Sequence, residues 1–531
     1  MSTSDRAILK HHPVVCPHCW HDFHDDEAWY ISRHTELQGD AVIADPEAFK
    51  RFGPHEVKVE RSGVVKDSMG LEMTERACPR CHLQIPVEML ERRPFFVSVA
   101  GAPSAGKTYF LTSMLHTLGL QMARSFKIMF SYCDSHDVRA FKDYDKQLFR
   151  GSANEETELP KTQKEMNTNV VALDGMRQVF LPKPFMFRFV PTHDHPAVAQ
   201  GKVVADANFV FYDNAGEAFD PDEGLHRQAE YRTTQHLKES SGVMFVYDPL
   251  QDGHVRDRLA GSQDPQVTVQ PKDCAQEAML GNLIDQIRTF RGLSGRDRID
   301  VPLAICVQKF DAWRALLPPW AKIDDTSVEY LKQHAIAALD VGELSRNSLI
   351  VRQLLEDVAP QFVSLAESSF SVVRYFPVSA LGTHPKVGSV PVDGKLPLLV
   401  RRGDIHPVRV TDPLLWFLSR WKLIPFAVSR SQAGTAASVV AANRDRMTVQ
   451  FPGSGIRMSL DWEYSGMTVV DPVDGTLVAI PKVERPAPTA PPLPSDRGPR
   501  PGEGPTPPPR KKGLSLDNPE ERKKKGGLWN G

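Results

Sequence analysis

Eight consecutive residues carry the clearest chemical pattern in this sequence. Residues 101–108 read Gly-Ala-Pro-Ser-Ala-Gly-Lys-Thr, with glycines at the first and sixth places and Lys-Thr after the second glycine. In such a loop, backbone N–H groups and a helix N-terminus face a polyphosphate, the lysine adds a cation, and the threonine hydroxyl can coordinate Mg²⁺. The pattern predicts a phosphate-binding loop. The residues expected to contact the ligand are Gly101, Ser104, Ala105, Gly106, Lys107 and Thr108.

The flanks of this loop have the periodicities that would position it. An apolar, partly β-branched run at 95–100 follows Pro94 and predicts a buried strand. Behind the loop, apolar residues at helical spacing predict a helix over 109–120. Strand, glycine loop and helix in this order separate a phosphate-binding loop from a chance match.

Two Cys-x-x-Cys pairs form a second chemical pattern. Cys16 and Cys19 can offer two thiolates to one ion, and Cys78 and Cys81 can complete the tetrahedral four-sulfur shell that zinc prefers. Four protein ligands leave no open coordination position, so we expect the zinc to be structural. Redox-active or unpaired thiols are the alternative.

Further strands and helices alternate along the chain. Strands are predicted at 184–190, 207–212, 242–247, 301–307 and 372–378, and helical segments at 275–290, about 327–369, and 412–422. This alternation predicts an α/β fold in which helices cover both faces of a mostly parallel sheet.

Polar residues follow the strand predicted at 207–212, and a polar stretch precedes the strand predicted at 184–190. Asp213 ends the strand at 207–212, where an acid beside the phosphate loop can hold Mg²⁺ through water, together with Thr108. Gly216 can offer its N–H to a terminal phosphate. The polar stretch at 131–178 predicts a mobile loop that brings Thr162 to the metal, and a solvated loop is the alternative.

Four motifs now stand in a fixed order: GAPSAGKT, DNAGE, QKFD and SALG. They resemble the translation-factor-like (TRAFAC) class of P-loop GTPases. With the cysteine pairs ahead of them, the chain looks like the bacterial double-GTPase type of predicted conflict systems, which carries N-terminal zinc knuckles. The resemblance covers about residues 94–425 and the first 92. It implies GTP, Mg²⁺ and Zn²⁺ as cofactors, slow hydrolysis, and a GTPase-like partner encoded nearby.

The resemblance also implies roles for individual residues. Lys309 would lie across the base, Asp311 would accept from the guanine ring N–H and amine, and the Ala380 backbone, next to Ser379, would contact the guanine oxygen. Gln308 stands where Asn or Thr is usual, so we expect a looser base pocket.

The residues expected to serve hydrolysis are Lys107, Thr162 and Glu217. Glu217 stands where a water-positioning Gln often occurs, so we expect slow intrinsic hydrolysis.

Composition limits the other classes of function. A net charge of −2 gives no global field that favours nucleic acid or an anionic membrane. No apolar stretch approaches the roughly 20 residues of a spanning helix, and the N-terminus lacks the apolar core of a signal peptide. The three remaining cysteines are isolated, as in proteins of a reducing compartment. The sequence predicts a soluble, cytoplasmic protein.

Changes of pattern divide the chain into four segments. We expect a zinc-knuckle module at 1–92, a GTPase domain at 93–425, a small β-rich appendage at 426–482 and a disordered, Pro-rich tail at 483–531. Basic clusters in the tail can contact nucleic acid or anionic lipid, and a solvated tail is the alternative because acids are interspersed.

Three functions remain open on the sequence. The first is a GTP-hydrolysing switch with a structural zinc module. The second is an ATPase of the same fold, against which the Lys309/Asp311 pair argues. The third is a zinc-containing scaffold whose nucleotide site binds without hydrolysis.

Overall fold

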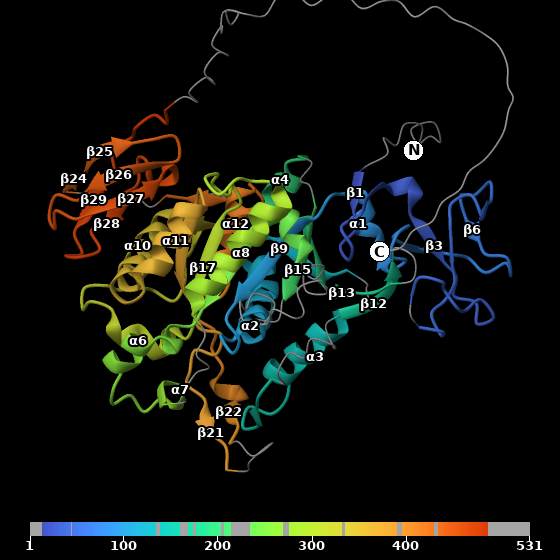
Figure 1. Cartoon of the computed structure of the whole chain (residues 1–531), viewed down its shortest axis with the longest axis horizontal. Coiled ribbons are helices and arrows are strands. Elements are labelled where there is room, and N and C mark those ends of the chain that lie inside the picture. Colours follow the sequence, from blue (N-terminus) through green and yellow to red (C-terminus); the bar gives the residue numbers. More distant parts are fainter. Residues whose placement is uncertain are drawn as a thin grey trace, which may run out of the picture. The chain divides into compact units, whose positions relative to one another are not determined.

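A seven-stranded sheet organises the computed structural model (Figure 1). Its spatial order is β10-β14-β15-β9-β16-β17-β20. The five strands β15, β9, β16, β17 and β20 are parallel to one another, whereas β14 is antiparallel to both β10 and β15. The strands are β10 Ile128–Tyr132, β14 Phe185–Pro191, β15 Ala207–Asp213, β9 Phe95–Gly101, β16 Ser240–Tyr247, β17 Leu303–Val307 and β20 Val373–Pro377.

The structure describes most of the chain. The described residues are 13–43, 45–133, 138–159, 168–173, 177–202, 206–213, 234–268, 275–331, 335–389, 396–428 and 434–486. One compact unit extends to Arg485, and residues 487–531 of the expected tail lie outside the described residues. Thr162, Gly216 and Glu217 also lie outside them.

Helices pack their apolar residues against this sheet in one large core. They are α2 Lys107–Gln121, α8 Gln276–Arg291, α10 Val341–Val358, α11 Pro360–Ser369 and α12 Asp412–Arg420. Figure 1 shows them around the central strands. The mixed α/β class with a largely parallel sheet is confirmed. No helix among the described residues combines the length and the apolar character needed to cross a bilayer.

Two segments differ from the sequence expectation. The start of the predicted helical stretch at 327–369 is a strand pair, β18 Val328–Leu331 and β19 Ile336–Asp340, and only then does α10 begin. Asp340 caps that helix by accepting the Glu343 N–H at 3.0 Å, which fixes where it starts. Sheet pairing of β19 with β23, Phe426–Ala427, is a long-range contact that local periodicity does not reveal.

The polar stretch at 131–178 is also more structured than a loop. It contains α3, Val138–Phe149, whose buried Phe141, Tyr144 and Leu148 follow helical spacing. A hairpin follows, made of β12 Thr168–Leu173 and β13 Arg177–Pro182. The apolar stripe of α3 is short, so the many charges around it conceal the helical period.

Alternate side chains of the sheet enter two different cores, because successive residues of a strand point to opposite faces. In β15, Phe209 and Phe211 belong to the large helical core, whereas Val210 and Tyr212 belong to a second core. That second core contains the cysteine pairs and residues of β12 and β13. On this part of the sheet, one face is therefore covered by the cysteine-bearing segment and the hairpin instead of by helices.

The cysteine-bearing segment is built from short strands. A four-stranded sheet of order β4-β3-β7-β8 joins its two halves. Its strands are β3 Trp29–Ile31, β4 Arg51–Phe52, β7 Glu75–Ala77 and β8 Gln84–Ile85, with β1 Pro13–Val15 and β2 Asp22–His24 paired beside the first cysteines. Helix α1, Val87–Glu91, leads from it into β9.

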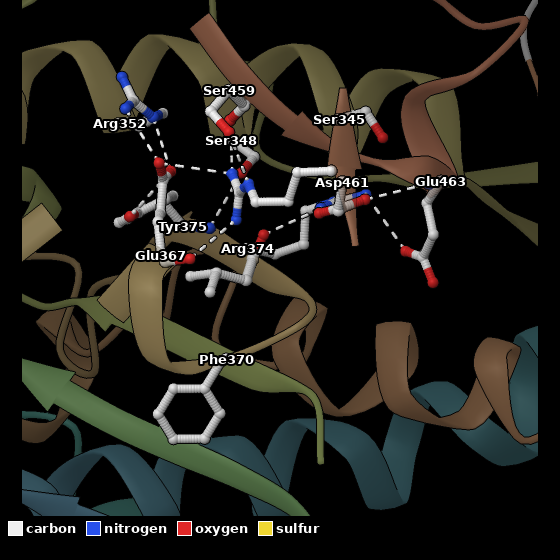
Figure 2. Close-up of polar contacts among 12 residues, drawn as sticks. Ser345, Ser348, Arg352, Glu367, Phe370, Arg374, Tyr375, Ser459, Asp461 and Glu463 are labelled. Carbon is white, nitrogen blue, oxygen red and sulfur yellow. Dashed lines mark hydrogen bonds and ion pairs between the residues drawn. The ribbon is translucent and has the colours of Figure 1, made fainter. Parts of the chain in front are cut away.

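The C-terminal described residues form two three-stranded sheets with their own core. The first contains β25 Ser438–Ala442, β26 Arg446–Gln450 and β27 Arg457–Asp461, and the second contains β24 Thr435–Ala436, β28 Thr468–Val470 and β29 Leu477–Ala479. Arg374 of β20 joins these sheets to the central one. Its guanidinium contacts the carboxylates of Asp461 and Glu463 (Figure 2).

Candidate nucleotide and metal sites

The loop between β9 and α2 has a backbone that only its residue types allow. Gly101 has φ 148°, and a Cβ there would lie 2.3 Å from the carbonyl oxygen of Val246 in the neighbouring strand. Gly106 ends the loop with φ 81°, in the left-handed region, and directly precedes α2. Both glycines of the sequence pattern are therefore required by local geometry.

Lys107 lies folded over this loop. Its side chain is largely buried, and its ammonium donates to the carbonyl oxygens of Gly101 at 3.1 Å and Ala102 at 2.8 Å. The cation is thus held directly above the backbone that would surround a phosphate.

Thr108 and Asp213 meet at the start of α2. The Thr108 hydroxyl donates to Asp213 Oδ2 at 2.9 Å. Burial raises the pKa of Asp213, while the charge of Lys107 and the hydrogen bond from Thr108 act in the opposite direction. A hydroxyl and a carboxylate side by side are oxygen ligands of the kind that Mg²⁺ accepts. The fold brings together the two residues that the sequence predicts to bind magnesium.

The loop occupies a topological switch point of the sheet. From β9 the chain continues to β15 on one side, and it then returns to place β16 on the other side. Ligands of open α/β sheets bind outside the carboxyl ends of the strands at such a point. Asp213, Gln308 and Ser379 lie at or just beyond the carboxyl ends of parallel strands β15, β17 and β20, so they face the same edge as the loop.

Gln308 connects three of the sequence motifs. Its amide nitrogen donates to the Gly106 carbonyl at 3.5 Å, and its amide oxygen accepts from the Ala380 N–H at 3.2 Å. The indole of Trp313 donates to the Gln308 carbonyl at 2.7 Å. The longer side chain at this position therefore spans from the phosphate-binding loop to the loop after β20.

Lys309 is held by an acid that sequence reasoning did not assign. Its backbone has φ 59°, and its ammonium contacts Asp248 Oδ2 at 2.6 Å. Asp248 is buried and follows β16 directly. Its position after a strand was visible in the sequence, but the pairing depends on the adjacency of β16 and β17.

Asp311 lines a cavity of about 340 Å³ at this edge. The Ser379 hydroxyl donates to Asp311 Oδ1 and accepts from the Gly382 N–H at 2.8 Å. Burial raises the pKa of the Asp311 carboxyl, against the lowering effect of the Ser379 hydrogen bond. The cavity is also lined by Ser262, Gln263, Asp264, Ala312, Gly382, Thr383 and His384.

The four paired cysteines form one buried cluster. Cys16 Sγ lies 3.7 Å from Cys81 Sγ, and Cys19 Sγ lies 3.7 Å from Cys78 Sγ. All four sulfur atoms lie within 4.8 Å of one another. Zn–S bonds of about 2.3 Å at tetrahedral angles separate sulfur atoms by about 3.8 Å. The cluster therefore has the dimensions of a structural four-sulfur zinc site.

The two pairs have matching backbone turns. The Trp20 N–H donates to the Cys16 carbonyl and the His82 N–H to the Cys78 carbonyl, each at 3.0 Å. Trp20 and His82 both have positive φ, at 55° and 59°. Burial raises the pKa of the Cys16 thiol well above its ordinary value, so metal binding must displace protons from the cluster.

The structure assembles most of the predicted site residues, but it adds others. Gln251, after β16, donates to the Pro103 carbonyl of the phosphate-binding loop at 2.9 Å. Asp264 lines the cavity beside Asp311. Both belong to a polar stretch that has no periodicity or motif, so no signal in the sequence could have identified them.

Comparisons with known proteins give little further information. No family model and no curated protein sequence matches the chain. Among solved structures, one match is a chain of the "Signal recognition particle receptor SRb-GTP/SRX complex" from Chaetomium thermophilum, with 14% identity over 55% of this chain and 94% of that chain. The TM-score is 0.21. At this TM-score the similarity carries no argument about fold or function.

Proposed function

We propose that the chain is a GTP-binding and GTP-hydrolysing switch with a structural zinc site. One observation carries the proposal: four separate sequence motifs meet at one edge of the sheet. The phosphate-binding loop, Asp213, the segment from Gln308 to Asp311 and the loop at Ser379 are far apart in the chain, yet they surround one switch point. A chance match to any single motif would not bring the others to it.

Each part has a distinct task in this proposal. The backbone of residues 101–106 and the Lys107 ammonium bind the phosphates, and Thr108 and Asp213 hold Mg²⁺. Asp311 selects the base because a carboxylate can accept both the ring N–H and the amine of guanine in one plane. Gln308 fixes the distance between the base and phosphate regions through its two amide contacts.

Hydrolysis rests on further residues in this proposal. Thr162 and Glu217 are the proposed partners of Lys107 in turnover, and Gly216 the proposed contact of the γ-phosphate. A carboxylate positions water less well than an amide, since it cannot both donate and accept, so slow turnover is expected without a partner. The proposed partner is a GTPase-like protein encoded nearby, as in the conflict systems that the motifs resemble.

Exchange of the base tests the proposal. In Asp311→Asn one carboxylate oxygen becomes a donor, so xanthine, which has a carbonyl where guanine has the amine, becomes complementary. We expect the variant to lose its affinity for GTP and to gain affinity for xanthosine triphosphate. Calorimetric titration with each nucleotide in the presence of Mg²⁺ measures both affinities. ATP is the matched control ligand and should bind neither protein. Unchanged preference for GTP in the variant, or preference for ATP in the parent, would contradict the assignment.

Release of phosphate separates a switch from a scaffold that only binds. Purified protein with GTP and Mg²⁺ should release inorganic phosphate slowly, and Lys107→Ala should abolish the release. Tight GTP binding without any release would favour the non-hydrolysing scaffold.

A further inference from the structure

A second buried carboxylate lines the cavity beside Asp311. Asp264 is 6% exposed and directly precedes α7, Pro265–Thr268. Its Oδ1 accepts the Gln266 N–H at 2.9 Å. Its Oδ2 has no hydrogen-bond partner among the residues that the structure describes. A buried carboxylate oxygen without a donor is costly, so this position favours a ligand that brings an N–H or O–H group.

The charge of Asp264 acts on Asp311, which lines the same cavity. Burial is the main reason that the pKa of Asp311 is raised, and the charge of Asp264 adds to it. Two carboxylates on one cavity repel a phosphate and attract a group rich in donors. The phosphate end of a nucleotide therefore belongs at the loop after β9, and the donor edge of its base belongs here.

Guanine has one more donor than Asp311 can accept in its plane. The ring N–H and one amine N–H face a single carboxylate, which leaves the second N–H of the amine for another acceptor. We propose that Asp264 accepts this second amine N–H and is a specificity-determining residue for guanine. The inference rests on the proposed function, because it takes the guanine base as the occupant of the cavity.

Selection against inosine triphosphate is the consequence that can be measured, because inosine lacks the amine. A site that pairs the amine on both sides leaves two buried acceptors unpaired when the amine is missing. We expect the wild-type chain to prefer GTP over inosine triphosphate by more than roughly tenfold, the scale of one hydrogen bond to a charged group.

The test uses Asp264→Asn in the full chain. Since the Gln266 N–H occupies Oδ1, we expect the amide to keep its oxygen there and to place its NH₂ where the unpartnered Oδ2 lies. That donor then opposes the guanine amine. Calorimetric titration should show GTP affinity reduced roughly tenfold and the affinity for inosine triphosphate unchanged. Asp257→Asn is the matched control, because this exposed acid of α6, Gly253–Arg258, lines a different cavity and carries the same charge.

Several results would overturn the inference. If Asp264→Asn lowers the affinities for GTP and inosine triphosphate equally, Asp264 only supports its loop. If neither affinity falls, Asp264 does not contact the nucleotide. If the variant binds GTP more weakly but binds 2′-deoxy-GTP with unchanged affinity, Asp264 contacts the ribose hydroxyl instead of the base. If Asp264→Asn does not fold, as judged by thermal melting, Asp264→Ala gives the same comparison without a new donor. Failure of the wild-type chain to bind either nucleotide would overturn the proposed function as well.

Discussion

At the level of single residues, Lys107 and His236 show two ways in which this fold uses a buried basic group. The Lys107 ammonium donates to two carbonyls of its own loop. His236 is also fully buried, but its imidazole stacks on the Tyr212 ring at 4.2 Å and contacts the Ser98 hydroxyl at 2.6 Å. Burial lowers the pKa of His236 from 6.5 to about 3, so this ring stays neutral.

Lys107→Ala should abolish nucleotide binding while the protein stays folded. The Lys107 ammonium donates to backbone carbonyls of its own loop, and in the proposed function it supplies the cation for the phosphates. Titration with a fluorescent GTP analogue should show no saturable binding, and the melting temperature should change by no more than a few degrees. Lys142→Ala, on the exposed side of α3, is the control and should bind normally. Unchanged affinity in Lys107→Ala would contradict the phosphate-binding loop.

His236 should make the protein less stable in acid. The unfolded chain binds a proton at this residue below about pH 6.5, whereas the folded chain does not until about pH 3. The contribution of neutral His236 to the free energy of unfolding is therefore complete above pH 6.5. It is lost as the pH falls toward 3, at about 1.4 kcal/mol per pH unit. The free energy of unfolding can be measured with denaturant at several pH values between 7 and 4. Below pH 6.5, its slope against pH should be smaller in His236→Asn than in the wild type by about 1.4 kcal/mol per pH unit. The exposed His193→Asn should keep the wild-type slope, and an identical slope in all three proteins would contradict the burial argument.

At the level of elements, the cysteine cluster packs directly on the strand that ends at Asp213. The Tyr212 hydroxyl donates to the Pro17 carbonyl at 2.6 Å and accepts from the Trp20 indole at 3.1 Å. Pro17 and Trp20 belong to the first cysteine turn, and Tyr212 immediately precedes the proposed magnesium residue. The cysteine cluster therefore supports one face of β15.

Loss of the metal should loosen this face of the sheet. Cys78→Ser removes one of four thiolates and with it most of the affinity for zinc. We expect about one zinc per wild-type chain by elemental analysis, much less in the variant, and altered Trp20 fluorescence. Because the phosphate-binding loop lies in the other core with α2, GTP binding should persist at temperatures below the lowered melting point. Cys306→Ser, at an isolated buried cysteine, should retain zinc. A metal-free wild-type preparation would contradict the assignment.

Local patterns predicted the elements whose signals are local. The strand, loop and helix around Gly101 to Thr108 were predicted because glycine spacing and apolar periodicity are properties of neighbouring residues. The contacts of Gln308 with Gly106 and Ala380, and the pair formed by Lys309 and Asp248, arise only when distant strands become neighbours. The pairing of β18, β19 and β23 is likewise long-range, so the local pattern at 327–340 predicts a helix where the structure has strands.

At the level of the whole molecule, one buried arginine joins the C-terminal sheets to the central one. Arg374 is 2% exposed and lies on the edge strand β20. It forms hydrogen bonds with both oxygens of Asp461 and, at 3.1 Å, with Glu463 (Figure 2). Its guanidinium also lies 4.1 Å from the centre of the Tyr464 ring. Nearby, Glu367 of α11 accepts from Arg352 of α10 at 2.7 and 3.0 Å. This second ion pair joins the two helices. The C-terminal sheets are thus attached through buried charges as well as apolar contacts.

Removal of the Asp461 carboxylate should therefore lower the free energy of unfolding far more than removal of an exposed carboxylate. Asp461→Ala leaves the Arg374 charge buried with reduced compensation, and breaking such a pair costs about 3–5 kcal/mol. Denaturant unfolding should show this loss, whereas Asp404→Ala, which breaks the exposed pair with Arg401, should change stability little. The double variant Arg374→Met with Asp461→Leu should recover much of the loss, since apolar side chains of similar volume can replace a buried ion pair. If Asp461→Ala and Asp404→Ala have equal effects, the buried pair does not hold the C-terminal sheets, and the apolar core around Met447 and Val469 must do so alone.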